Sequence, residues 1–164
     1  MTNTQKIEDA FWKSLRSDMT VMLVLCEDAK DRARPMTALI DGDTDAGPIY
    51  FFGGRDSTLF HQLGAEAAKA EFTYVPKGHG LFAAVEGDLS VCHDSAVIER
   101  LWNPFVAAWY PGGKTDPNLV LFKMDLGEAK VWLNGSSLIA GIKMLFGVDP
   151  RTTFEDNVAE LKLG

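Results

Sequence analysis

Residues 20–52, TVMLVLCEDAKDRARPMTALIDGDTDAGPIYFF, hold three successive strand patterns separated only by turns. The apolar runs predict strands at Thr20–Cys26, Arg34–Ile40 and Pro48–Phe52, with an Asp/Gly-rich hairpin loop at 41–47. Neighbouring parallel strands would need a crossover connection, usually a helix, between each pair, and no helical pattern fits between these three. The stretch therefore predicts an antiparallel sheet.

The rest of the chain extends this sheet and adds helices around it. Three more strands, a short alternating tail and four helices are predicted from apolar spacing and turn residues. The strands are Glu71–Val75, Gly80–Cys92 and Leu119–Leu133, the tail is Asn157–Leu163, and the helices are Ile7–Leu15, Ser57–Leu63, Ser95–Trp102 and Ser136–Phe146. A glycine inside the predicted strand Gly80–Cys92, Gly87, predicts a bulge or a close backbone approach. This order predicts an α+β fold that is mostly β, an antiparallel barrel with flanking helices.

Length and composition are those of an ordinary globular domain. The chain has 164 residues, 46% of them hydrophobic, which suits a single domain over residues 1–164. The net charge of −7 and the lack of a basic block argue against nucleic acid or an anionic membrane as a partner. No apolar stretch approaches the roughly 20 residues needed to cross a bilayer, and no leader-like N-terminus is expected. Cys26 and Cys92 lie in strand-like runs. We therefore expect a cytoplasmic protein with two reduced core cysteines.

Motifs of metal or nucleophilic catalysis are absent from the sequence. His61, His79 and His93 stand alone, with no second ligand at metal-binding spacing, so no metal site is predicted. There is no G-x-S-x-G motif, and Gly53-Gly54 is too short for a P-loop or a dinucleotide fingerprint. No nucleophile is indicated.

An anion site is a stronger candidate. Arg32 and Arg34 open one strand, and Arg55 follows Gly53-Gly54 just before a predicted helix start at residues 56–58. Glycines allow a ligand close to the backbone, while hydroxyls, free N–H groups and arginine bind phosphate. The alternative is that these are solvated arginines beside an ordinary helix cap.

Aromatic residues gather in the proline- and glycine-rich loop predicted over residues 103–117. Trp102, Phe105, Trp109 and Tyr110 lie within nine positions of one another. Each tryptophan can bury about 200 Å², so these side chains are expected to cover something. A flap over the core, a partner subunit and a planar ligand all fit this pattern.

Two sets of residues resemble a known family. The segments RARPMT at 32–37, IYFFG at 49–53 and DST at 56–58 resemble the FMN-binding half of the pyridoxamine 5′-phosphate oxidase superfamily. The segments LWNP at 101–104 and AWYPGG at 108–113, with Asp116-Pro117 and Val131-Trp132, are similar to its bacterial general stress protein branch. The resemblance spans about residues 5–147.

The resemblance implies a fold, a cofactor and a set of site residues. The fold is a six-stranded antiparallel split β-barrel that forms a homodimer, with FMN, or alternatively FAD, in two clefts between the subunits. The flavin-binding positions implied are Arg34, Pro35, Met36 and Thr37 at the polar edge of the ring, Phe51, Phe52 and Gly53 beside it, Ser57 and Thr58 at the phosphate, and Trp109 reaching the cleft from the second subunit. Leu59 stands where many relatives have a phosphate-binding cation. The resemblance therefore leaves two alternatives: Arg55 or Lys114 replaces that cation, or FMN binds weakly.

The same resemblance bears on function. It implies an FMN-dependent oxidoreductase of unknown substrate, reduced by NADH or NADPH. The substrate motifs of the vitamin-processing oxidases are absent, and residues 160–164 read ELKLG, so pyridoxamine phosphate is not the expected substrate. One alternative is a non-catalytic module that stores or senses flavin during stress. Another is a split barrel that binds a different planar ligand, such as haem or a deazaflavin.

Overall fold

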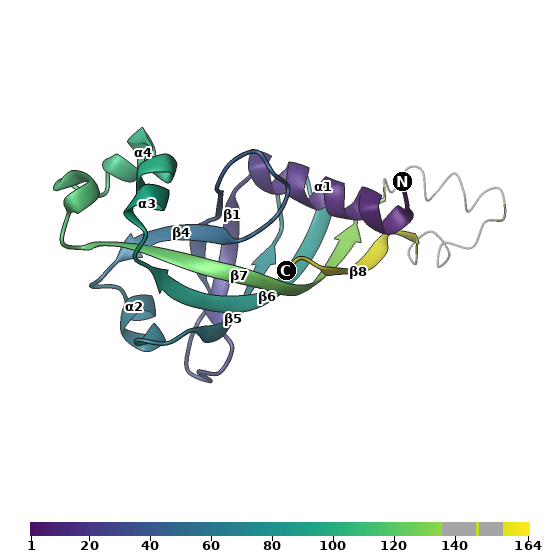
Figure 1. Ribbon diagram of the computed structural model, residues 1–164. Coiled ribbons are helices and arrows are strands. Elements are labelled where there is room, and N and C mark those ends of the chain that lie inside the picture. Colours follow the sequence, from purple (N-terminus) through teal and green to yellow (C-terminus); the bar gives the residue numbers. More distant parts are fainter. Residues whose placement is uncertain (136–146, 148–155) are drawn as a thin grey trace.

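A single curled antiparallel sheet dominates the computed structural model, which describes residues 1–135, 147 and 156–164 (Figure 1). Its strand order is β2-β1-β5-β6-β7-β4-β3, with β8 paired to β7. The strands are β1 (Thr20–Leu25), β2 (Arg34–Thr37), β3 (Leu39–Ile40), β4 (Ile49–Gly54), β5 (Ala68–Tyr74), β6 (Leu81–Cys92), β7 (Leu119–Leu133) and β8 (Val158–Lys162). This architecture confirms the predicted mostly β split-barrel fold. The helix predicted over Ser136–Phe146 lies outside the described residues.

The segment 34–40 joins the two edges of the sheet. It was predicted as one strand, but it divides at Ala38 into β2, which pairs with β1, and β3, which pairs with β4. The N–H of Ala38 instead donates to the carbonyl oxygen of Met19 at 2.7 Å. With this division and β8, the described residues form eight strands, where six were expected. Because one segment contacts both edges, the sheet curls into a barrel.

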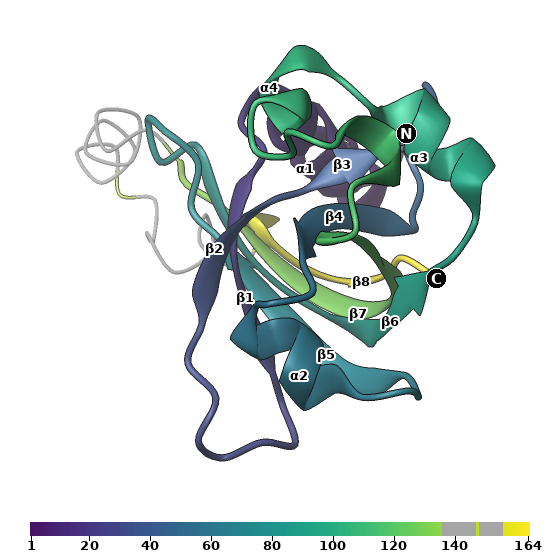
Figure 2. The same cartoon turned by 90° about the vertical axis from the view of Figure 1, so that its left-hand side faces the viewer.

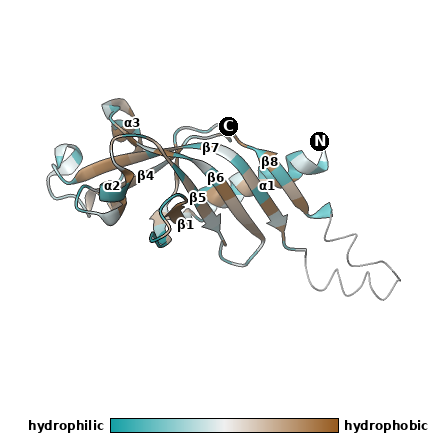
Figure 3. Cartoon of the chain, turned by 90° about the horizontal axis from the view of Figure 1, so that it is seen from below, coloured by the Kyte–Doolittle hydropathy of each residue, from teal (hydrophilic) through white to brown (hydrophobic). Residues whose placement is uncertain are grey.

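The barrel core is filled from the inner face of the sheet and from α1 (Asn3–Ser17). Ile7, Phe11, Trp12 and Leu15 recur at helical spacing and are at most 1% exposed, so one face of α1 is wholly buried. Hydrophobic and hydrophilic residues alternate along the strands that this helix covers (Figure 3). Burying side chains of this size stabilises the fold by about 1.5 to 3 kcal/mol each.

The other helices of the described residues lie at the end of the barrel where β4 ends and β7 begins (Figure 1). They are α2 (Thr58–Leu63), α3 (Ser95–Leu101), α4 (Pro104–Ala107) and the 3₁₀ turn Gly113–Thr115. Val97 of α3 packs on Tyr50 and Leu121, on the sheet face opposite the core residue Phe51. This packing holds α3 and the segment after it against the end of β4.

Two local predictions have different outcomes. The register of β6 against β7 shifts between Val85 and Gly87, which confirms the expected bulge. A Cβ atom on Gly87 would run into the backbone oxygen of Asp125, so the backbones approach closely there. Cys26 and Cys92 are both free thiols, but the prediction that Cys26 lies in the core is wrong. It follows the last residue of β1 and is exposed, because the chain leaves the sheet at that point.

Candidate functional site

A cleft of about 870 Å³ opens where β2 and β3, the end of β4 and the α4 segment meet. Figure 2 faces this end of the molecule and shows α4 close to β3 and β4. Most of its wall is apolar, with polar groups at a few positions. The lining residues are Met19, Thr20, Pro35, Met36, Thr37, Leu39, Phe52, Gly54, Asp56, Asn103, Phe105, Val106, Trp109, Tyr110 and Asn118. Volume and lining are those of a site for a small organic ligand.

The aromatic segment is attached to the end of β4 by Tyr110. Its buried hydroxyl donates to the carbonyl oxygen of Gly53 at 2.7 Å. The ring of Trp102 lies between the rings of Tyr110 and Phe52, with centroid distances of 6.4 and 6.1 Å. Burial raises the pKa of Tyr110, and the nearby carboxylates of Asp116 and Asp56 raise it further. The hydroxyl therefore stays protonated and continues to donate at neutral pH.

Local capping explains why the segment folds as a short helix rather than the predicted loop. Asn103 precedes Pro104, and its side chain accepts from the N–H of Val106 at 3.0 Å. Proline is favourable in the first turn because its missing N–H would have had no partner there. The result is α4, which presents Phe105 to the cleft and to solvent, and Trp109 follows two residues after its end and is likewise exposed to both.

These two aromatic side chains cover nothing within the described part of the chain. Phe105 is 85% exposed and Trp109 is 81% exposed, although both line the cleft. The interpretation as a flap over this chain's own core is therefore wrong for them. Exposed aromatics at a cleft indicate a ligand or partner surface.

Five of the predicted site residues line the cleft: Pro35, Met36, Thr37, Phe52 and Trp109. Two other predicted residues on β4 adjoin it without lining it. The ring of Phe51 is fully buried in the barrel core, because alternate residues of a strand face opposite sides. Gly53 takes part only through the carbonyl oxygen that Tyr110 binds.

Arg34 is held away from the lining by Asp31. The guanidinium donates to both carboxylate oxygens of Asp31, to one of them at 3.0 Å. The same carboxylate accepts from the N–H of Leu25 at 2.8 Å, and Asp31 is only 8% exposed. Burial acts to raise the pKa of Asp31, but the hydrogen bonds from Arg34 and Leu25 outweigh it and lower the pKa below its ordinary value. This network fixes the start of β2, and hence the position of Pro35 and Met36.

Ser57 is the N-cap of α2, at the helix start predicted over residues 56–58. It accepts from the N–H of Phe60 at 3.1 Å and donates to the carbonyl oxygen of Gly54 at 2.6 Å. The single proton of the Ser57 hydroxyl is therefore already donated within the chain. Thr58 is exposed at the first position of α2.

The two cations predicted to replace the one missing at residue 59 lie outside the cleft lining. The Arg55 guanidinium sits over the ring of Phe60, 5.4 Å from its centre. Lys114 forms an ion pair with Glu99. Leu59 itself is buried in the barrel core. Neither Arg55 nor Lys114 therefore belongs to the cleft wall.

Sequence reasoning assigned no role to several lining residues. Asn118 carries the clearest signal, because it follows an Asp-Pro pair immediately before a long strand. Its side-chain oxygen accepts from the N–H of Asp56 at 3.1 Å, which connects the turn after β4 to the start of β7. Met19 lies between α1 and β1, and no motif marks it.

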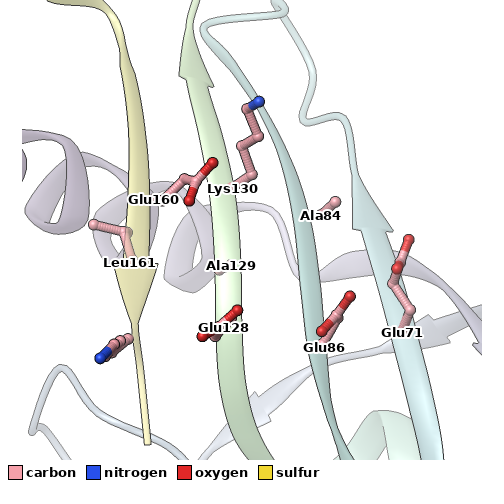
Figure 4. A pocket seen from close by; sticks show the side chains of 9 residues that line it. Glu71, Ala84, Glu86, Glu128, Ala129, Lys130, Glu160 and Leu161 are labelled. Atoms are coloured by element: carbon pink, nitrogen blue, oxygen red, sulfur yellow. The ribbon is translucent and has the colours of Figure 1, made fainter.

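A smaller cavity of about 290 Å³ lies on the outer face of β5 to β8 (Figure 4). Glu71, Glu86, Glu128 and Glu160 come from four neighbouring strands, and Lys130 lies among them. Among residues 1–135, 147 and 156–164, no group of three or more His, Cys, Asp or Glu side chains is placed to hold a metal ion. Within the same ranges, no helix is both long and apolar enough to span a bilayer.

Solved structures with this fold come from several bacteria. A general stress family protein of Xanthomonas campestris pv. campestris is 49% identical, with a TM-score of 0.77 over 84% of this chain and 93% of that one. The general stress FMN/FAD binding protein of Xanthomonas citri is also 49% identical, with a TM-score of 0.76 over 82% and 93%. General stress protein 26 of Jannaschia sp. CCS1 shares the fold at 22% identity, with a TM-score of 0.77 over 97% and 99%.

Two further comparisons concern the sequence. No curated protein matches this chain. The family model described as pyridoxamine 5′-phosphate oxidase like matches residues 6–152, which is most of the chain. The protein therefore belongs to the pyridoxamine 5′-phosphate oxidase-like family.

Proposed function

We propose that this protein binds a flavin nucleotide, FMN, in the cleft between β2, β4 and α4. The observation that carries the proposal is the pair Phe105 and Trp109, which are 85% and 81% exposed on the wall of that cleft. Planar heteroaromatic rings are the ligands that such side chains stack on most favourably. The 49% identical protein of Xanthomonas citri, an FMN/FAD binding protein, supports the same ligand class and leaves FAD as the alternative.

The residues present fit the ring system. Met36, Phe52 and Trp109 supply apolar surface for the isoalloxazine, and the side chains of Thr37 and Asn118 supply hydrogen-bonding groups for its polar edge. Beyond Gly54 the chain turns through residues 55–58, where we expect the phosphate to lie near Arg55 and Thr58. Arg34 would act indirectly, by holding β2 in place through Asp31.

A flavin-dependent oxidoreductase reaction with NADH or NADPH is the activity we propose for the loaded protein. The only titratable side chains of the described lining are Asp56 and Tyr110, and the Tyr110 hydroxyl is bound to Gly53. A bound flavin supplies hydride and electron transfer itself, so the protein needs only to bind and orient it. None of the described lining residues is lysine or arginine, so they offer no cation for the phosphate of pyridoxamine phosphate.

The same sparse lining favours a second candidate, a module that stores or senses flavin without turnover. The rate of NADH or NADPH oxidation by the loaded protein separates the two. A rate above that of free FMN supports the oxidoreductase, and a rate equal to it supports the module.

A homodimer is the assembly that we propose. Met19, Met22 and Val75 are exposed to 40%, 40% and 55%, and with Phe105 and Trp109 they leave much apolar surface uncovered on one chain. Light scattering on the eluted protein should give twice the chain mass of 18.0 kDa. A monomer would contradict this part of the proposal.

The central experiment is a visible absorption spectrum of the purified protein, followed by titration with FMN and FAD. We expect a bound flavin spectrum and strong quenching of flavin fluorescence, because tryptophan stacked on the ring quenches it. A colourless protein that leaves flavin fluorescence unchanged would refute the proposed function while the fold remains.

A further inference from the structure

We infer that the cleft recognises the uncharged part of a flavin and gains little from its phosphate, and that Asp56 sets this preference. The inference rests on the proposed function, since it concerns which flavins the same cleft accepts. It predicts that riboflavin, which lacks the phosphate, binds about as tightly as FMN.

The first observation is the charge of the wall. None of the described residues that line the cleft is lysine, arginine or histidine, and the one ionised side chain among them is Asp56. Two neighbouring cations are neutralised elsewhere: Arg34 pairs with Asp31, and Lys114 pairs with Glu99. A site built to hold a phosphate normally directs lysine or arginine at it.

The second observation is the position of the Asp56 carboxylate. A Cβ atom on Gly54 would run into this carboxylate, so the charge lies directly over the backbone of a cleft residue. The N–H of Asp56 donates to the side chain of Asn118, which holds the turn in this orientation. The carboxylate itself makes no hydrogen bond and no ion pair with the described residues.

The third observation comes from the neighbouring tyrosine. Burial is the main cause of the raised pKa of Tyr110, but the charges of Asp116 and Asp56 add to it. Two carboxylates therefore act on the end of the cleft where the hydroxyl of Tyr110 meets Gly53.

These features have a consequence for the ligand. A phosphate monoester carries about −1.5 to −2 charges at pH 7. Arg55, beside Asp56 in the chain, attracts this charge, but the uncompensated carboxylate and the net charge of −7 repel it. The repulsion is slightly the larger of the two, so the phosphate adds nothing to the affinity, which comes from the ring and the ribityl chain that FMN and riboflavin share.

The test is a fluorescence-quenching titration of the whole protein with riboflavin and with FMN, at low salt and again at about 0.5 M salt. We expect the two dissociation constants to agree within about threefold at low salt. Because salt screens repulsion, added salt should strengthen FMN binding and leave riboflavin binding unchanged. A site that grips the phosphate with cations would show the opposite salt dependence.

Variants identify the residue responsible. Asp56→Asn should strengthen FMN binding about three- to tenfold and leave riboflavin unchanged. Asp9→Asn removes the same charge from the exposed face of α1 and should change neither affinity.

Three outcomes would overturn the inference. FMN binding more than about tenfold tighter than riboflavin would show that the phosphate is recognised after all. If Asp56→Asn and Asp9→Asn bind FMN with equal dissociation constants, Asp56 does not set the preference between FMN and riboflavin. If neither flavin binds, the proposed function itself fails, and this result is distinct from unequal binding of the two.

Discussion

The hydroxyl of Tyr110 donates a hydrogen bond of 2.7 Å to the carbonyl oxygen of Gly53, across 57 positions of the sequence. Gly53 belongs to β4, whose end lines part of the cleft, and Tyr110 follows Trp109, which lines the same cleft. One bond thus sets the distance between the strand and the aromatic segment. Because Tyr110 is only 9% exposed, the bond is largely shielded from competing water.

Replacing Tyr110 with phenylalanine tests this connection. The ring is kept, but the carbonyl oxygen of Gly53 loses its donor, so we expect the free energy of unfolding to fall by about 1 kcal/mol. With Trp109 less firmly placed, flavin affinity should fall severalfold. Urea denaturation and flavin titration measure the two effects.

Tyr74→Phe is the matched control for that variant. Tyr74 also donates from a buried hydroxyl, to the carbonyl oxygen of Asp18 at 2.6 Å, but it does not line the cleft. It should lower stability without lowering flavin affinity. Equal losses of affinity in the two variants would contradict a specific role for Tyr110.

Trp109→Ala separates ligand binding from folding. The side chain is 81% exposed, so its removal should change the free energy of unfolding by no more than about 0.5 kcal/mol. Loss of a stacking surface should weaken FMN binding about tenfold. Trp12→Ala, at a side chain 1% exposed in the core, should instead cost about 3 to 5 kcal/mol. Unchanged FMN affinity in Trp109→Ala would remove this residue from the site.

Asp31→Asn should destabilise the protein in a pH-dependent way. At neutral pH we expect the free energy of unfolding to fall by about 2 to 3 kcal/mol. This is less than the loss expected for a fully buried ion pair, because the side chain of Arg34 is 22% exposed. The pKa of Asp31 is lowered in the folded state, so its ionised form stabilises the fold above about pH 4, the unfolded value, and this stabilisation is lost as the pH falls through the folded pKa.

Urea denaturation between neutral pH and about pH 3 gives the measurement for that variant. The difference in stability between the parent and Asp31→Asn should shrink as the pH falls below about 4. Asp9→Asn, at an exposed position on α1, serves as the control and should match the parent. A difference that stays constant with pH would show that the ionisation of Asp31 does not contribute.

Gly87→Ala tests the close approach in the bulge of β6. An added methyl group would meet the backbone oxygen of Asp125, which cannot move without disturbing β7, so we expect a loss of about 2 kcal/mol or more. Gly127→Ala is the control, because its Cβ would lie 3.5 Å from the oxygen of Glu86, an ordinary contact. Its stability should stay within about 0.5 kcal/mol of the parent. Similar thermal midpoints for the two variants would contradict the close packing.

Much of the architecture follows from local sequence. The runs in 20–52 predict antiparallel strands because side-chain alternation and turn residues act over a few positions. The division of residues 34–40 at Ala38 was not predictable in the same way. It arises because β1 pairs with the first part of that segment and β4 pairs with the last part, and both pairings exist only in the closed sheet.

The candidate site, too, was predictable in part from local sequence and in part not. The family, the place of the aromatic segment and the lining residues Pro35, Met36 and Thr37 could all be predicted from the residues and their order. Which side chains are free to contact a ligand depends on the folded arrangement. The guanidinium of Arg34 donates to the carboxylate of Asp31, and the hydroxyl of Ser57 donates to the carbonyl oxygen of Gly54. The physical reason is that a charged or polar side chain binds whichever partner the fold brings nearest, and a linear pattern does not contain that distance.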